Sequence, residues 1–159
     1  MNSERIQKLR DFLNDTDFYN APSSRQYHGS YPGGLAKHSD YVFLNLLSLT
    51  ERMGLQWQEE DSPYIVAMGH DVCKIGLYVI NDGKYEYNTE HAQGHGDLSV
   101  KMLKDIIELT PEEEACIRWH MGAFDDSKNW GEYTTAIHKF PNVLWTHTAD
   151  MMAAHIDEI

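Results

Sequence analysis

Residues 62–76 read SPYIVAMGHDVCKIG, an apolar segment that ends in an adjacent histidine and aspartate. The opening Ser-Pro pair is typical of a helix start, because proline fits the first helical position, where its missing N–H is not needed. Gly76 is a typical helix stop. The segment therefore predicts a buried helix that brings His70 and Asp71 into the interior.

Further helices are predicted on both sides from apolar residues that recur every three or four positions. Residues 110–113 read TPEE, a capping box with proline in the first turn, which marks a helix start. Residues 21–34 and 123–133 have the composition of long loops, and a short amphipathic segment is expected after the second. The expected helices cover residues 3–14, 35–53, 62–76, 98–107 and 110–122, and a last one opens at Pro141.

One short β-hairpin is predicted among these helices. Residues 77–80 and 84–87 are rich in Tyr, Val and Ile and are joined around Asp82 and Gly83, a pair that favours a tight turn. A length of 159 residues suits one domain. We therefore expect residues 1–159 to form a single all-α domain, a compact bundle of six or seven helices with one hairpin.

The composition narrows the classes of partner. The chain has 13 Lys and Arg against 25 Asp and Glu, a formal net charge of −12. Because phosphate backbones are bound mainly through Lys and Arg, we expect no long nucleic acid as a partner. Residues 1–12 are too polar for a secretory signal and no stretch suits a membrane span, so we expect a cytoplasmic protein without membrane contact. Cys73 and Cys116 are expected to be reduced, buried thiols, and an oligomer is compatible with this sequence.

Five polar residues fall on predicted helix faces that should point into the core. Burying an ionised aspartate is costly unless it is paired or binds a metal. A His-Asp pair alone is weak evidence in a chain with nine histidines. Together, five such groups on four helices have a common explanation in a divalent transition ion, which accepts imidazole and carboxylate ligands. These residues are His38, His70, Asp71, His120 and Asp150.

Five short motifs resemble the HD-domain phosphohydrolase superfamily, and the match spans most of the chain from about residue 27. The core pattern of that superfamily is one histidine, then a His-Asp pair, then a distant aspartate. Two further histidines between the pair and the last aspartate mark its branch with a second metal. The motifs are GGLAKHS at 33–39, GHDVCKIG at 69–76, GHG at 94–96, RWHMG at 118–122 and HTAD at 147–150.

The resemblance implies a set of metal ligands. One or two divalent ions (Mn, Fe, Co, Ni or Zn) would be bound, and Asp71 would bridge between them. A metal-activated water would then attack phosphorus. The first ion would be held by His38, His70, Asp71 and Asp150, and the second by His95 and His120.

Lys74 is the candidate catalytic partner of Asp71. It lies three residues beyond Asp71 and four beyond His70, hence on the same face of the predicted helix. Its ammonium could bind a phosphoryl oxygen of the substrate.

Other substrate contacts are expected outside this helix. The long loop offers Arg25 and His28 to a phosphate or a base. Arg118 is a further candidate, for which a salt bridge to residues 112–114 is an equally good explanation. His91 either carries a proton to the leaving group or caps the hairpin.

We therefore expect a metal-dependent phosphohydrolase that cleaves a phosphate ester of a nucleotide or nucleotide-like small molecule. Two alternatives stay open, since one fold supports several functions. One is a di-iron HD-domain oxygenase with a similar ligand set, and the other is an HD module that senses a nucleotide without turnover. All six ligand positions are filled, which argues against a degenerate module.

Overall fold

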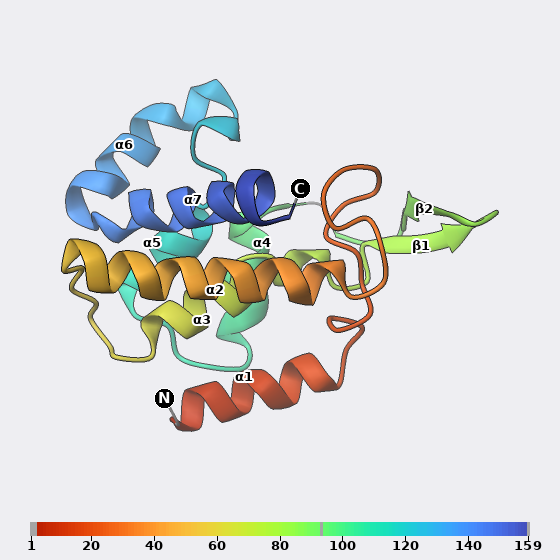
Figure 1. Ribbon diagram of the computed structural model, residues 1–159, viewed down its shortest axis with the longest axis horizontal. Coiled ribbons are helices and arrows are strands. Elements are labelled where there is room, and N and C mark those ends of the chain that lie inside the picture. The colour runs from red at the N-terminus through yellow and green to blue at the C-terminus, as the bar shows by residue number, and fades with distance from the viewer. Residues whose placement is uncertain (1–2, 93, 159) are drawn as a thin grey trace.

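The computed structural model describes residues 3–92 and 94–158. Within them the chain forms seven α-helices and one antiparallel hairpin, which confirms the predicted all-α bundle (Figure 1). No described helix is both long and apolar enough to cross a membrane. The helices are α1 (Glu4–Asn14), α2 (Gly34–Met53), α3 (Ser62–Gly69), α4 (Gly96–Lys104), α5 (Pro111–Arg118), α6 (Trp130–Lys139) and α7 (Asn142–Met152), and the strands are β1 (Tyr78–Asn81) and β2 (Lys84–Tyr87).

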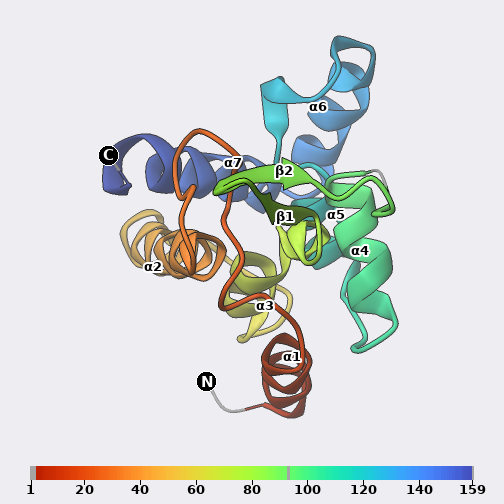
Figure 2. The ribbon, with the colours of Figure 1, turned by 90° about the vertical axis from the view of Figure 1, so that its right-hand side faces the viewer.

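The centre of the bundle is α3, all of whose residues are buried. Helix α2 packs against α3 and α7, and α5 also packs against α7. In contrast, the hairpin extends away from the bundle (Figure 1), and α6 lies at the edge of the bundle (Figure 2). Because α3 ends in the middle of the molecule, the two residues after it enter the interior.

Local signals in the sequence set the starts of two helices and the hairpin turn. The Ser3 hydroxyl accepts a hydrogen bond from the Ile6 N–H at the start of α1. Thr110 and Glu113 form both hydrogen bonds of the predicted capping box at the start of α5. Asp82 and Gly83 have φ values of 52° and 76°, the left-handed conformation that tight hairpin turns require.

Two helices end earlier than the sequence predicted. Helix α3 stops at Gly69 instead of residue 76, and a 3₁₀ turn, Val72–Lys74, follows. Helix α5 stops at Arg118 instead of residue 122. Apolar spacing continues through these turns, so periodicity alone does not reveal the ends. In addition, α6 begins at Trp130, inside the stretch predicted to be irregular.

A glycine at the end of α3 permits close packing against α4. A Cβ atom built at Gly69 would lie 2.7 Å from Cδ1 of Leu103, well inside van der Waals contact. The side chain of Leu103 in α4 therefore packs directly against the backbone of α3. Cys73 and Cys116 are buried free thiols, as predicted.

Candidate metal centre

Five of the six predicted metal ligands meet in the interior, and we call these five residues the His/Asp centre. They come from α2, from the turns that follow α3 and α5, and from α7. Each residue is at most 7% exposed. They form two groups that could hold a metal ion, one of His38, His70 and Asp150 and the other of His70, Asp71 and His120.

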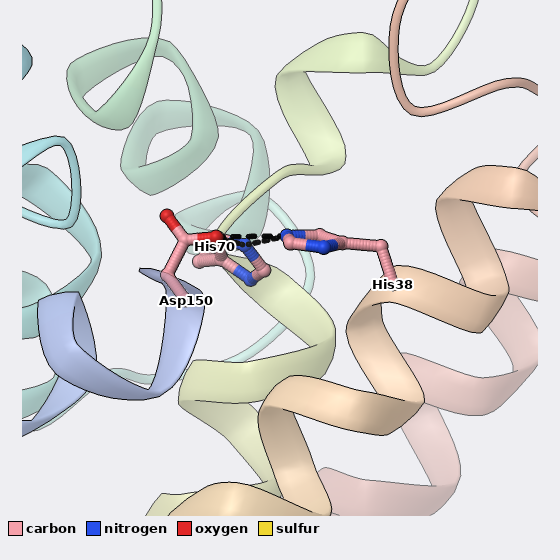
Figure 3. A group of neighbouring side chains, drawn as sticks. All are labelled: His38, His70 and Asp150. Atoms are coloured by element: carbon pink, nitrogen blue, oxygen red, sulfur yellow. Dashed lines mark hydrogen bonds and ion pairs between the residues drawn. The ribbon is translucent and has the colours of Figure 1, made fainter. Parts of the chain in front are cut away.

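The facing atoms of the centre are imidazole Nε2 and carboxylate oxygen. Nε2 of His38 lies 2.8 Å from Oδ1 of Asp150 and 3.3 Å from Nε2 of His70 (Figure 3). Oδ2 of Asp71 lies 3.3 Å from Nε2 of His70. The other oxygen, Oδ1, lies 3.3 Å from Nε2 of His120. The two oxygens of Asp71 therefore face different histidines.

The other ring nitrogen of each histidine is held by an acceptor. Nδ1 of His70 is 2.7 Å from the carbonyl oxygen of Ala67, and Nδ1 of His120 is 2.8 Å from that of Ile117. A carbonyl oxygen only accepts hydrogen bonds, so both Nδ1 atoms carry a proton. In the neutral ring, Nε2 then presents a lone pair to the centre, as a metal ligand must.

His38 is held differently. Its Nδ1 is 2.6 Å from Oε2 of Glu158, a residue 120 positions away in the sequence. The Glu158 side chain is only 2% exposed. No motif or periodicity in the sequence indicated this residue, so sequence analysis missed it.

The charges of this region leave a negative excess. Asp71, Asp150 and Glu158 contribute three carboxylates, whereas Lys74 contributes one ammonium, 3.2 Å from Asp71. Two positive charges are needed for balance. Either protons on two imidazoles or one divalent ion supplies them, so the donor set and its charge fit such an ion.

Without an ion, the imidazoles carry this charge. Burial alone would lower the pKa of His70, but Asp71 and Asp150 outweigh burial and raise that pKa to about 10. Burial would also lower the pKa of His38, but the carboxylates of Asp150 and Glu158 outweigh burial and raise it. Burial would raise the pKa of Asp71, yet His70 and Lys74 hold it well below its usual range.

The His/Asp centre forms one side of a pocket of about 180 Å³. Lys74, His28 and His155 line this pocket together with four residues of the centre, and a group of apolar side chains forms the rest of the wall. An ion in the centre would therefore face a space that a small molecule can enter. The apolar lining residues are Met121, Phe124, Met151 and Ala154.

Lys74 lies where the sequence placed it, beside Asp71. The 3₁₀ turn after α3, and not a continuous helix, brings the two together. Its Nζ also donates a hydrogen bond of 2.7 Å to the carbonyl oxygen of Ser23, which attaches the long loop to the centre.

The two candidates from the long loop lie in different surroundings. His28 is half-buried, lines the pocket, and has its ring centroid 5.4 Å from that of His38. Arg25 is exposed and lies over the ring of Tyr87 at 4.9 Å, so it contacts the hairpin and does not line the pocket.

Arg118 and His95 also lie outside the pocket. The predicted salt bridge from Arg118 to residues 112–114 is wrong, because its guanidinium lies 3.5 Å from Asp125 and stacks on Trp119. His95 is exposed at the start of α4 and belongs to neither metal-binding group. Nε2 of His91 bonds to the carbonyl oxygen of Ile75 at 2.8 Å, next to the hairpin.

Comparisons with family models, with curated proteins and with solved structures find no match for this chain. The resemblance to the HD-domain superfamily therefore rests on the five sequence motifs. The geometry and charge of the His/Asp centre fit a divalent metal ion independently of that resemblance.

Proposed function

We propose that this protein is a metal-dependent phosphohydrolase of the HD-domain type that cleaves a phosphate ester of a nucleotide or nucleotide-like molecule. The observation that carries the proposal is that four residues of the His/Asp centre and the ammonium of Lys74 line one pocket. Hydrolysis of a phosphate ester needs positive charge at the phosphoryl oxygens and an activated water. A divalent ion, when bound, supplies that activation by lowering the pKa of a coordinated water.

His38, His70 and Asp150 would hold the ion, with Asp71 beside them. His70 can serve only one ion, because its Nδ1 is bonded to a backbone carbonyl and only Nε2 is free. A second ion would be left with Asp71 and His120 unless the exposed His95 moved toward them. We therefore propose one tightly held ion, drawn from Mn, Fe, Co, Ni or Zn.

The protein's own residues would bind and orient the ester. The ammonium of Lys74 has three N–H groups, of which two face Asp71 and the Ser23 carbonyl, so the third can bind a phosphoryl oxygen. The apolar wall, including Met121 and Phe124, would contact the organic part of the substrate, and an aromatic base suits such a wall.

A substrate panel tests this proposal. Protein supplied with Mn²⁺, Co²⁺ or Ni²⁺ should hydrolyse at least one ester among nucleoside monophosphates, deoxynucleoside triphosphates, cyclic nucleotides and a generic aryl phosphate. Asp71→Ala should abolish this hydrolysis, whereas Asp40→Ala, which changes an exposed carboxylate of α2, should retain it. No turnover of any ester by the metal-loaded protein would refute the proposal.

Further measurements on the same metal-loaded protein distinguish the alternative functions and determine the number of bound ions. Nucleotide binding without turnover would indicate a sensor, and oxygen consumption with an organic phosphonate or polyol would indicate an oxygenase. Elemental analysis should find one equivalent of metal, which His70→Ala removes and His95→Ala leaves in place. Two equivalents that fall to one in His95→Ala would contradict the single-ion assignment.

A further inference from the structure

The three histidines of the centre are held by two kinds of acceptor. His70 and His120 bond to backbone carbonyls three residues earlier, at the ends of their own helices. His38 lies near the start of α2 and bonds instead to a carboxylate from the far end of the described chain. Two imidazoles are therefore oriented locally, and the third depends on a long-range contact.

Glu158 follows the π-helical turn Ala153–Asp157, which continues α7 past Asp150. Its Oε2 accepts the hydrogen bond from His38, while its Oε1 is buried and has no hydrogen-bond partner among the described residues. Leaving a buried carboxylate oxygen without a donor is unfavourable. A purely structural contact gives no reason to keep the charge there.

A carboxylate bonded to the far nitrogen of a metal-binding histidine has a known physical effect. It fixes the tautomer that leaves the near nitrogen free, restricts ring rotation, and makes the imidazole a stronger electron donor. A backbone carbonyl also fixes the tautomer and restricts ring rotation, but it carries no net charge. Glu158 thus gives His38 a property that His70 and His120 lack.

We propose that Glu158 is a positioning residue for the metal ion, holding His38 with Nε2 free and thereby linking the turn after α7 to metal binding. The inference rests on the metal-binding part of the proposed function. Because coupling between two events is reciprocal, the ion should also order the turn.

Cobalt affinity tests the inference without any assay of turnover. The dissociation constant of Co²⁺, measured by competition with a chelator, should rise about 10- to 100-fold in Glu158→Ala, and about 10-fold in Glu158→Gln, which keeps an oxygen acceptor but loses the charge. The visible spectrum of bound Co²⁺ should also change. Asp157→Asn is the matched control, since Asp157 lies in the same turn but bonds to Asn45. Its Co²⁺ affinity should stay within about twofold of the wild type.

Amide hydrogen exchange tests the reciprocal effect. Co²⁺ should slow exchange in residues 153–158 of the wild type and of Asp157→Asn, but not of Glu158→Gln. A structural role alone would lower the melting temperature of Glu158→Gln and leave its Co²⁺ affinity and spectrum unchanged, and that result would overturn the inference. If the wild type bound no Co²⁺, the metal centre itself would be refuted together with the inference.

Discussion

Two clusters of buried charged side chains within residues 3–92 and 94–158 differ in how fully their hydrogen bonds are satisfied. In the first, which we call the Arg5 cluster, the guanidinium bonds to both oxygens of Glu113 at 2.7 and 2.9 Å and also to Asp61. Ser3 donates to the second oxygen of Asp61, and Ser62 donates to Glu113. All four carboxylate oxygens of the Arg5 cluster therefore accept at least one hydrogen bond.

The His/Asp centre has the opposite character. Its carboxylate oxygens and Nε2 atoms face one another, and they become compatible only when protons or a cation stand between them. The Arg5 cluster joins α1, α5 and the start of α3. Its charged groups satisfy one another and need no added proton or ion. Incomplete satisfaction, and not burial of charge as such, distinguishes a site from a structural network.

Breaking the Arg5 cluster should cause the largest loss of stability. Arg5→Met leaves the fully buried side chain of Glu113 without its cation, which should lower the free energy of unfolding by about 3 kcal/mol. Urea unfolding measures the change. Lys8→Met is the control, because its pair with Glu4 is exposed and should be worth less than about 1 kcal/mol. Equal losses in the two variants would show that the Arg5 cluster contributes nothing special.

Adding a metal ion to the His/Asp centre should raise the free energy of unfolding by slightly less than Arg5→Met lowers it. Co²⁺ at about 100 times its dissociation constant should stabilise the wild type by about 2.7 kcal/mol, a rise in melting temperature of roughly 5–10 °C. The rise should grow with pH, because the imidazoles must lose their Nε2 protons to bind. Asp150→Asn should lose the effect, and Arg5→Met should keep it. The same rise in Asp150→Asn would place the ion elsewhere.

The smallest expected effect is the loss of stability at low pH that follows from protonation of Asp61. Burial would raise the pKa of Asp61, but the hydrogen bonds from Arg5 and Ser3 outweigh it and lower that pKa. Its contribution to stability is therefore present above the unfolded pKa of about 3.9 and is lost as the pH falls through the lower folded value. Between pH 5 and 2, the unfolding free energy of the wild type should fall more steeply than that of Asp61→Asn. Parallel profiles would contradict the assignment.

The sequence predicted elements whose causes are local. Caps, apolar periodicity and the Asp-Gly turn indicated the helices and the hairpin, and core-facing positions indicated the five residues of the His/Asp centre. It did not predict where α3 and α5 end, because the apolar spacing continues through the turns that follow both helices. His70 and His120 each follow such an end, so the error in helix length falls at the ligands themselves.

The sequence also did not predict which residues far apart along the chain form ion pairs or hydrogen bonds. Arg5 pairs with Glu113 across 108 positions, and His38 pairs with Glu158 across 120. These contacts depend on how whole helices pack. The capping box marks Glu113 as a helix-start residue but does not indicate Arg5 as its partner, and nothing around Glu158 sets it apart from the chain's other acids. The predicted role of His95 likewise came from a motif, whereas the fold leaves that side chain in solvent.

The contact between Gly69 and Leu103 gives position 69 an importance that its chemistry does not suggest. This glycine has no side chain of its own, yet a methyl group added to it would meet the Leu103 side chain of α4 and force that side chain or α3 to shift. His70 is the next residue along the chain, so any shift of the α3 backbone would fall beside the His/Asp centre. A larger residue at position 69 would therefore disturb the backbone that carries a candidate metal ligand while leaving all five residues of the centre unchanged.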